Sequence, residues 1–432
     1  MTYIIETFGC KVNQCQSAAA GQRLRLNGFT PCGEREAPDV VIINSCTVTG
    51  NSDKKVIREI SRMKKRFPEA KIVLTGCFPA AFPDKARETE ADFIAFSNNL
   101  DELYSLLSLS DSSDVPGIDS IMLGKVPDID SIKKRTRAFI DIQNGCDNFC
   151  TYCIIPKARG SELRSRPVRE IADMAEKAAR FHKEIVLTGI NLVKYNSEYN
   201  GKQYNLADIV QMITRIPGVA RVRLSSVEPE NFLPEMFAPL SNNSAFCAHF
   251  HMSLQSGSNG VLSRMGRRYT REDYRRIMLR LAEMFPGAAF TTDVIAGFPG
   301  ESDGEFRETE EFLRECSFAR LHIFTYSRRE GTAAAEMPGQ IPEHVKRDRY
   351  LKLKEAGNEL QRNFLLPHVG KSLEILTEKP HVCDKQDNAA YSVGRAKDYT
   401  KVVLYDEEIE KGKLLTVKII SAENDRLVGE VV

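Results

Sequence analysis

Two patterns of hydrophobic and polar positions alternate in the first hundred residues. Short apolar runs over residues 2–8, 39–45 and 71–76 have the length and composition of β-strands. The run over 39–45 is continuous, as expected of a strand that is buried on both faces. Helical stretches over residues 15–28 and 53–67 lie between these runs. Strands that alternate with helices indicate a parallel α/β sheet.

A second alternating series fills the middle of the chain. Helical stretches such as residues 168–181 and 271–285 separate most of its strand candidates. Six βα units over about 200 residues favour a partial or full βα barrel over an open sheet. The strand candidates are residues 138–143, 184–188, 221–225, 248–254, 288–295 and 321–326.

The composition of the chain changes at two further places. Residues 105–134 are rich in Ser, Asp, Gly and Pro and predict a linker. Several short strands with turns between them in residues 367–432 predict a small β-barrel. The fold class is therefore α/β, with four parts. These are an N-terminal parallel α/β domain (1–104), the linker (105–134), a central partial (βα)6 barrel (135–366) and a C-terminal β-barrel (367–432).

The overall composition narrows the class of protein. The 432 residues are 42% hydrophobic and 28% charged, which excludes disordered and collagen-like chains. No run approaches the ~20 apolar residues of a membrane span, and the N-terminus shows no signal peptide. We therefore expect a cytoplasmic protein without a membrane partner. The 11 cysteines, an odd number in a long chain without an export signal, favour metal or redox chemistry over disulfides.

Three cysteines form a C-x3-C-x2-C run just after the first strand of the second series: Cys146, Cys150 and Cys153. Three thiolates on one loop can ligate three irons of a cubane cluster and leave the fourth iron open. The alternatives are a zinc site or three incidental cysteines. Structural zinc prefers four ligands, usually in C-x2-C pairs, and no second pair lies nearby in the sequence.

Three more cysteines, Cys10, Cys46 and Cys77, each follow a predicted parallel strand of the N-terminal domain. Ligand sites in such sheets form at the carboxyl ends of strands, so these cysteines are expected to meet in space. Small apolar cysteine is also common at buried strand ends. Position alone therefore leaves a second metal site open.

The motifs resemble a known family. The C-x3-C-x2-C loop with Tyr152 is similar to the radical S-adenosylmethionine superfamily, and FGCKVNQ, INSCTVT and LTGC resemble its methylthiotransferases. The resemblance covers essentially the whole chain, including a C-terminal module similar to a TRAM domain. It implies two [4Fe–4S] clusters and S-adenosylmethionine. The six catalytic and metal-ligating residues would then be Cys10, Cys46, Cys77, Cys146, Cys150 and Cys153, with Cys15, Cys32, Cys247, Cys316 and Cys383 as structural residues.

The other strand ends of the central domain are expected to bind the cofactor. Gly189 follows a strand where backbone can approach a ligand closely. The resemblance implies that Tyr152, Ile295 and Gly297 lie along the adenine and that Gln255 and Ser256 lie near the ribose or methionine. It also leaves Ser226, Glu228 and Asp293 facing either cofactor or substrate. For any one of these the alternative is a loop-capping or turn residue. His249 and His251 share one face of a strand, and we expect them to line a pocket or the core rather than to bind zinc.

The net charge of +1 conceals two basic stretches. Residues 131–170 hold nine Lys plus Arg against four Asp plus Glu, and residues 261–280 hold seven against two. Such excesses are compatible with phosphate contacts, and the alternative is a solvated helix face. The C-terminal barrel is expected to add RNA contacts, as oligonucleotide-binding barrels do.

The resemblance implies an enzyme that adds a methylthio group to C2 of a modified adenosine beside the anticodon of tRNA. S-adenosylmethionine would be cleaved to methionine and a deoxyadenosyl radical that activates C2, because ordinary acid–base groups cannot substitute this C–H bond. The implied partners are the tRNA anticodon stem-loop, a reducing electron donor such as flavodoxin or ferredoxin, and a sulfur source. FGCKVNQ and the compact C-terminal module favour the branch that acts on threonylcarbamoyladenosine. Isopentenyladenosine, a ribosomal-protein aspartate, or a noncatalytic iron–sulfur RNA-binding role are the alternatives.

Overall fold

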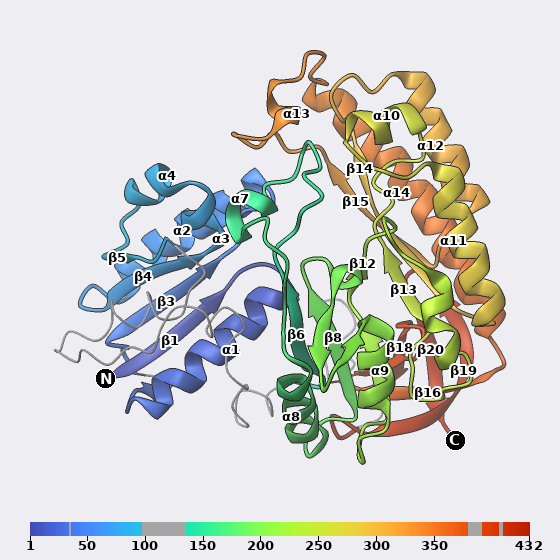
Figure 1. Ribbon diagram of the computed structural model, residues 1–432, viewed down its shortest axis with the longest axis horizontal. Helices are drawn as coiled ribbons and strands as arrows, with labels where there is room; N and C mark the ends of the chain where they lie inside the picture. Colours follow the sequence, from blue (N-terminus) through green and yellow to red (C-terminus); the bar gives the residue numbers. More distant parts are fainter. Residues whose placement is uncertain (34–35, 97–134, 379–390, 406–408) are drawn as a thin grey trace.

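The computed structural model describes residues 1–33, 36–96, 135–378, 391–405 and 409–432. The chain forms two α/β parts side by side, with a closed β-barrel against the second (Figure 1). The predicted linker over 105–134 and Cys383 lie outside the described residues. Within the ranges given, no helix combines the length and apolarity needed to cross a membrane.

A five-stranded parallel sheet forms the N-terminal part, as the alternating pattern predicts. Its order is β2-β1-β3-β4-β5, with β1, β3 and β4 at the centre. The three central strands run from the N-terminus toward the middle of the molecule (Figure 1). The strands are β1 (Thr2–Thr7), β2 (Thr30–Pro31), β3 (Val40–Ser45), β4 (Lys71–Gly76) and β5 (Phe93–Ile94), and the helices are α1 (Lys11–Leu26), α2 (Gly50–Arg66), α3 (Cys77–Ala81) and α4 (Pro83–Arg87).

Helix α1 begins at Lys11, earlier than the hydrophobic pattern predicts. Its first turns carry Asn13 and Gln16, which are polar but buried. Buried polar side chains are tolerated where they are hydrogen-bonded, and both accept hydrogen bonds from Arg159 of the central part. The first turn of the helix therefore lacks the apolar pattern that predicts the start of a helix.

Seven parallel strands and the short antiparallel strand β7 form a split, partly open barrel in the central part. They lie in two sheets, ordered β11-β8-β6-β7 and β12-β13-β14-β15, and a bridge between Val222 and Phe246 links the sheets. The prediction of a partial βα barrel is confirmed. Its strands are β6 (Ala138–Asn144), β7 (Arg164–Ser165), β8 (Glu184–Gly189), β11 (Arg221–Leu224), β12 (Ser226–Val227), β13 (His249–Met252), β14 (Ala289–Ala296) and β15 (Arg320–Thr325).

Helices cover the outside of this barrel (Figure 1). After β12 the chain forms a 3-10 helix, η3 (Pro234–Leu240), which contains Pro239. Proline lacks the N–H of a continuing α-helix. The α-helices are α7 (Ile155–Arg159), α8 (Val168–Ala179), α9 (Leu206–Thr214), α10 (Asn259–Arg264), α11 (Arg271–Met284), α12 (Asp303–Glu315), α13 (Ala333–Glu336) and α14 (Glu343–Leu365). The smaller elements are η2 (Leu192–Lys194), β9 (Ser197–Tyr199), β10 (Lys202–Tyr204) and η4 (Leu366–His368).

The last part is a closed five-stranded barrel, as predicted. Its order is β16-β17-β18-β20-β19. It packs at the amino ends of β6, β8 and β11, where Arg221 donates to the Glu374 carbonyl at 2.7 Å and Arg223 donates to the Lys397 carbonyl at 2.8 Å. The strands are β16 (Ser372–Thr377), β17 (Tyr391–Ala396), β18 (Lys401–Tyr405), β19 (Leu414–Glu423) and β20 (Arg426–Val431).

Candidate functional site

The C-x3-C-x2-C loop follows β6 at the open end of the central barrel. Arg267 donates to Cys150 Sγ at 3.0 Å, and the Asn191 amide lies 3.9 Å from Cys146 Sγ. Asn191 Oδ1 beside them is buried and has no hydrogen-bond partner within the described chain. A bound group with a donor would satisfy it, so the loop fits a ligand as well as a cluster.

Burial makes these cysteines poor free thiolates. It raises the pKa of Cys146, and it raises the pKa of Cys153 to about 12. Burial also raises the pKa of Cys150, against the opposing charge of Arg267. Thiols of this kind ionise when a metal supplies the compensating positive charge. The donor set therefore suits metal ligation rather than free nucleophilic chemistry.

The second set gathers at the carboxyl ends of β1, β3 and β4, as the sequence predicts. Gly9 and Gly76 both have positive φ, and a Cβ at Gly9 would lie 2.8 Å from Cys46 Cβ. Only glycine allows the chain before Cys10 to approach Cys46 this closely. Cys46 and Cys77 are buried and Cys10 is exposed. The ionised forms of Cys10 and Cys77 each raise the pKa of Cys46, after burial itself, so the three thiols share one environment.

Neither cysteine set has the spacing of a mononuclear site. In the portion of the chain that the structure describes, neither brings its three sulfur atoms within 4.8 Å of one another. Three thiolates on one zinc ion at Zn–S distances of about 2.3 Å would lie about 3.8 Å apart. Cluster thiolates bind different irons and are spaced more widely. The sulfur atoms of each set therefore lie farther apart than three ligands of one zinc ion do.

Arg159 connects the two cysteine sets. It belongs to α7, which begins two residues after Cys153, and its guanidinium donates to Asn13 Oδ1 at 2.6 Å. Asn13 also accepts from Cys10 Sγ at 3.3 Å. Arg159 is buried and lies against the Cys77 thiol, which together with Cys10 and Cys46 raises the pKa of the guanidinium although burial alone would lower it. Buried N–H groups beside three thiols fit the negative charge of a ligated cluster.

The two sets also share one hydrophobic core. Helix α3 begins at Cys77 and packs against α7. Phe78 and Phe82 of the N-terminal part lie in the same apolar cluster as Ile154 and Ala158 of the central part. This packing fixes the position of one cysteine set relative to the other.

A second contact holds the N-terminal part at the far side of the barrel opening. Arg329, in the loop after β15, donates to Thr47 Oγ1 and to Asp53 Oδ2, both at 2.7 Å. Gly50 N donates to Ser327 Oγ at 3.0 Å. The segment after Cys46 is therefore tied to the central part as well.

The residues expected along the adenine lie together. Tyr152 and Ile295 pack against one apolar cluster that contains Phe298, and the Tyr152 and Phe298 rings meet edge to face at 6.4 Å. Gly297 has φ +75°, and a Cβ there would lie 2.4 Å from Lys346 Cγ. Gly297 N donates to Glu301 Oε2 at 2.8 Å. Packing alone therefore requires glycine at position 297.

Three other expected contacts have structural partners of their own. Gln255 has a positive φ and pairs with strand β14, because its N–H donates to the Asp293 carbonyl and its carbonyl accepts from the Ile295 N–H. Ser256 Oγ is buried 3.1 Å from Thr309 Oγ1 of α12. A Cβ at Gly189 would lie 2.9 Å from Leu192 Cδ2. The Ser256 hydroxyl is directed to α12, so only its backbone is free to face a cofactor.

Ser226 and Asp293 line a cavity of about 270 Å³ inside the barrel. Glu228 lies nearer the cysteine loop, where it forms an ion pair with Arg267. His249 and His251 line the same cavity, as expected of a pocket wall, but a carboxylate that the spacing in the sequence did not indicate, Asp293, lies 3.2 Å from His251. His322 lines the same cavity, and nothing in the sequence pattern indicates it there.

Asn13, Asn44, Arg159 and Arg267 are the neighbours of the cysteines that sequence reasoning missed. Asn44 donates to Ser17 Oγ at 2.9 Å and to the Asn13 carbonyl at 3.0 Å. Asn13 in FGCKVNQ and Asn44 in INSC could have been recognised from the sequence. An amide next to a buried strand end needs hydrogen-bond partners and so indicates a polar site there. The two arginines had no such local signal.

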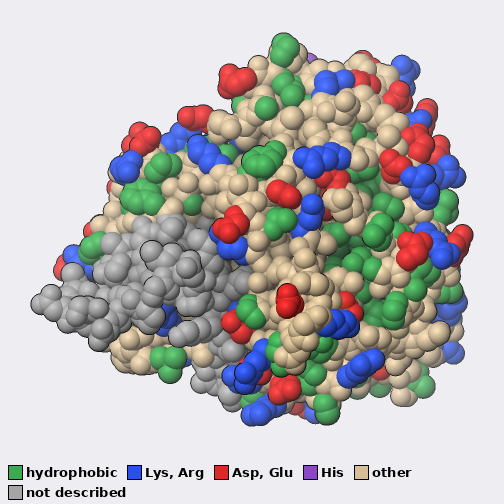
Figure 2. Space-filling model, viewed as in Figure 1, with side chains coloured by type: hydrophobic (Ala, Val, Ile, Leu, Met, Phe, Trp, Pro, Cys, Tyr) green, Lys and Arg blue, Asp and Glu red, His purple; other side chains and the backbone are tan. Residues whose placement is uncertain are grey.

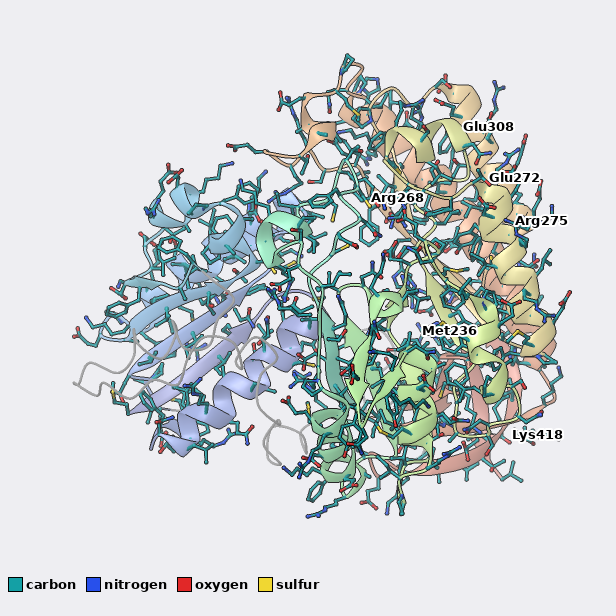
Figure 3. All side chains as sticks on the ribbon, viewed as in Figure 1. Met236, Arg268, Glu272, Arg275, Glu308 and Lys418 are labelled. Carbon is teal, nitrogen blue, oxygen red and sulfur yellow. The ribbon has the colours of Figure 1, made fainter. Side chains whose placement is uncertain are left out.

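The second basic stretch is largely neutralised. Its arginines pair with nearby acids, as in Arg264–Glu305 at 2.9 Å and Arg271–Glu272 at 2.9 Å. Figure 2 shows positive and negative side chains interspersed along the edge of the molecule formed by α11 and α12. Figure 3 shows Glu272, Arg275 and Glu308 on that outer edge, with Arg268 closer to the centre. The stretch over 261–280 is therefore not one continuous basic face.

Two family profiles match separate parts of the chain. The profile of the Radical SAM superfamily matches residues 140–313, and the profile of the uncharacterized protein family UPF0004 matches residues 2–96. The first match contains the C-x3-C-x2-C loop and the second contains the other cysteine set.

Curated relatives cover nearly the whole chain. A threonylcarbamoyladenosine tRNA methylthiotransferase of Thermotoga maritima is 38% identical over 87% of this chain and 86% of its own. A tRNA-2-methylthio-N(6)-dimethylallyladenosine synthase of Clostridium novyi is 32% identical over 100% of this chain and 96% of its own. A solved radical S-adenosylmethionine methyltransferase, TsrM of Kitasatospora setae, shares the fold with a TM-score of 0.57 at 17% identity, over 77% of this chain and 75% of that one. The chain therefore belongs to the radical S-adenosylmethionine methylthiotransferases, an enzyme family whose chemistry uses a [4Fe–4S] cluster and S-adenosylmethionine.

Proposed function

We propose that the enzyme transfers a methylthio group to C2 of N6-threonylcarbamoyladenosine next to the anticodon of tRNA, using two [4Fe–4S] clusters. The observation that carries the proposal is the Arg159 connection. One buried guanidinium, on the helix that follows Cys153, lies against the environment of Cys10, Cys46 and Cys77. A second ligand set held this firmly beside the first suits a reaction that needs two metal centres.

Two observations favour the threonylcarbamoyl substrate over the dimethylallyl (isopentenyl) one. The Thermotoga maritima and Bacillus subtilis relatives named for threonylcarbamoyladenosine are 38% and 36% identical and the Clostridium novyi relative named for dimethylallyladenosine is 32% identical, although a Chlamydia pneumoniae relative with the first name is 31% identical. Nine charged side chains, six basic and three acidic, line the barrel cavity together with three histidines. A hydrocarbon side group gains little in such surroundings, because the polar groups would lose hydration without a partner.

In this proposal Cys146, Cys150 and Cys153 hold the cluster that binds S-adenosylmethionine. When bound, these groups supply the radical chemistry that no side chain of the chain provides. Arg267 holds Cys150 in place, and its charge is balanced by Glu228. Tyr152, Ile295 and Gly297 form the wall expected along the adenine, while Gly189, Gln255 and Ser256 offer backbone groups.

Cys10, Cys46 and Cys77 hold the second cluster, where sulfur for the methylthio group is delivered. Arg159 and Asn13 position its ligands. A reductant of the flavodoxin or ferredoxin class supplies electrons, and an external source supplies sulfur. The target base lies in a loop of the anticodon stem-loop, where single-stranded bases can be turned into a protein pocket. In this scheme the N-terminal domain (1–104) delivers sulfur, the central domain (135–366) generates the radical, and the C-terminal barrel (367–432) docks RNA.

Nucleoside mass spectrometry of tRNA from a strain that lacks the gene tests the substrate. The methylthio form of threonylcarbamoyladenosine should disappear and return on complementation. If that form persists while the methylthio form of isopentenyladenosine disappears, the substrate assignment is wrong. If both persist, the ribosomal-protein substrate is examined by peptide mass spectrometry.

Iron content and cofactor cleavage test the chemistry. Anaerobically reconstituted protein should hold about eight irons per chain, as two four-iron clusters require, and should form 5′-deoxyadenosine from S-adenosylmethionine when reduced. About four irons per chain would remove the N-terminal set from the mechanism. Intact clusters without cleavage would favour a noncatalytic RNA-binding role.

A further inference from the structure

The cavity inside the barrel lies beneath the predicted cofactor residues and is closed below by the C-terminal barrel. Tyr399 of the loop between β17 and β18 lines it and stacks on His249 with ring centroids 5.3 Å apart. Lys11, the first residue of α1 and the neighbour of Cys10, lines it too. The cavity is thus bounded by all three parts of the chain, next to one ligand of the second cysteine set. Its volume of about 270 Å³ suits a side group of a substrate rather than a whole nucleotide.

A compact polar layer forms one wall of the cavity. His251 Nε2 lies 3.2 Å from Asp293 Oδ2, and His322 Nδ1 lies 3.9 Å from Asp293 Oδ1. Thr291 Oγ1 lies 2.9 Å from His251 Nδ1 and fixes the orientation of that ring. Asp293 is therefore held as a hydrogen-bond acceptor at a defined place in the barrel.

Taken alone, this His–Asp–His trio has the composition of a divalent-metal site. The charges around it argue for an anion instead. Six cationic side chains line the cavity against three carboxylates. The cationic residues are Lys11, Arg137, Arg223, Arg320, Arg395 and Lys401, and the acidic residues are Asp293, Asp398 and Asp425.

Three of these six cations have no ion-pair partner among the described residues. Arg137 and Arg223 both donate to the buried Glu184, at 3.0 and 2.7 Å. In contrast, the side chains of Lys11, Arg320 and Lys401 make no hydrogen bond or ion pair with the described residues. Of these three, Lys401 lies in the field of Asp425, whereas Lys11 and Arg320 lie nearer the His–Asp–His trio. Burial lowers the pKa of His322, which leaves that ring neutral near pH 7. The free charge on this wall is therefore positive.

We propose that this cavity binds the side group on N6 of the substrate adenosine. Lys11 and Arg320 bind its carboxylate, and Asp293, held by His251, accepts from its hydroxyl or amide N–H. This inference rests on the proposed function, since the threonylcarbamoyl group carries all three of these polar groups. The dimethylallyl group carries none of them and would leave two cations desolvated without a partner. The same residues therefore both attract the one substrate and exclude the other.

The test uses full-length, anaerobically reconstituted enzyme and three synthetic anticodon stem-loops. One carries threonylcarbamoyladenosine, one carries its methyl ester, which removes the negative charge, and one carries dimethylallyladenosine. Kd is measured without reductant, so binding is separated from turnover. Arg320→Gln and Lys11→Gln should each raise Kd for the first stem-loop about tenfold or more, as loss of a charge-assisted hydrogen bond does. Neither should change Kd for the methyl ester more than about twofold.

Matched measurements keep the outcomes distinct. Arg307→Gln, on the exposed face of α12, should bind all three stem-loops as the wild type does. Iron content shows whether Lys11→Gln has disturbed the adjacent Cys10, and Arg320→Gln, on strand β15, does not carry that risk. Wild-type turnover of threonylcarbamoyladenosine with unchanged Kd in both variants would overturn this inference alone. Zinc or manganese retained by the wild type and lost in His251→Ala would also overturn it. Wild-type turnover restricted to dimethylallyladenosine would overturn the proposed function and this inference together.

Discussion

The guanidinium of Arg159 donates a 2.6 Å hydrogen bond to the side-chain oxygen of Asn13, across 146 positions of the sequence. Arg159 follows the cysteine loop of the central barrel, and Asn13 follows Cys10 of the N-terminal sheet. The segment around Cys10 and Asn13 in the N-terminal part is thereby held by Arg159 of the central part.

Arg159→Met should weaken the second cluster and spare the first. The change removes the cation beside Cys10, Cys46 and Cys77 and takes from Asn13 Oδ1 the shorter of its two hydrogen bonds, at a cost of about 1–3 kcal/mol. Iron should fall from about eight to about four per chain. Cleavage of S-adenosylmethionine in the absence of RNA should persist. Arg169→Met, an exposed arginine on α8, is the matched control and should keep all of its iron.

Arg267→Gln should lower the reduction potential of the first cluster. Arg267 donates to Cys150 Sγ at 3.0 Å, and hydrogen bonds to cluster sulfurs raise the potential because they stabilise the more negative, reduced state. A charge-assisted bond of about 1.5–3 kcal/mol corresponds to roughly 60–130 mV for one electron. Potentiometric titration followed by electron paramagnetic resonance measures the shift. Arg264→Gln, whose side chain pairs with Glu305 instead, should not shift it, and an unchanged potential in R267Q would contradict the assigned contact.

Much of the fold could be predicted from the sequence because each strand is marked by its own apolar run and by the turn residues that follow it. The apolar run over 71–76 coincides with β4 and ends at Cys77, as the strand-end argument requires. Glycine at 76 signals the turn, since a Cβ there would lie 2.5 Å from the Ser45 carbonyl oxygen. Period and turn chemistry suffice where a residue's environment is set by its neighbours in sequence.

The remaining features of the candidate site depend on contacts between segments that are distant in sequence. The hydrophobic period of a single segment carries no information about such contacts. His251, Asp293 and His322 come from three successive strands and meet only after the barrel closes. The basic stretch over 261–280 suggested an RNA surface, but three of its acidic partners, Glu235, Glu305 and Glu315, lie on other elements. Charge counts along a sequence cannot show which charges are neutralised in three dimensions.

Glu184→Gln should destabilise the junction between the central barrel and the C-terminal barrel. Glu184 is fully buried and accepts from Arg137 and Arg223, and these two arginines lower its pKa although burial alone would raise it. Removing one partner of a buried ion network costs about 3–5 kcal/mol, so the midpoint of thermal unfolding should drop by several degrees. Calorimetry checks this, with the exposed Glu176→Gln as control. Equal midpoints for both variants would show that the arginines find other counter-ions.

The contact between His368 and Asp398 should make the stability of the C-terminal barrel depend on pH. Their side chains lie 3.2 Å apart, and hydrogen bonding to Asp398 raises the pKa of His368. The raised pKa means that this contribution is fully present below the unfolded histidine value of about 6.5 and is lost as the pH rises through the folded value. Burial would raise the pKa of Asp398, but its hydrogen bonds lower that pKa overall. Asp398 therefore becomes protonated, and the pair loses its negative charge, only in strong acid. His368→Ala should therefore lower the unfolding midpoint at pH 5.5 and much less at pH 9. A difference independent of pH would indicate that only packing was lost.

Arg268 is the arginine of the second basic stretch best placed to contact RNA. It is exposed, and its side chain has no ion pair or hydrogen bond with the described parts of the chain, whereas Arg275 lies 3.6 Å from Glu315. Figure 3 shows Arg268 closer to the centre of the molecule and Arg275 on the outer edge. The Arg268 backbone N–H donates to Glu230 Oε1 at 3.1 Å, which fixes its position next to Arg267 and therefore near the cysteine loop.

Arg268→Gln should weaken binding of every anticodon stem-loop by a similar factor, because a phosphate contact carries no information about the modified base. The slope of log Kd against log salt should become shallower by about one, as expected when one phosphate contact is lost. Arg275→Gln should change neither quantity, since its charge is already paired. A loss confined to the threonylcarbamoyladenosine stem-loop would instead place Arg268 among the groups that recognise the base. No change in the slope would exclude a phosphate contact, and the RNA surface would then have to lie on residues outside α11 and the loop before it.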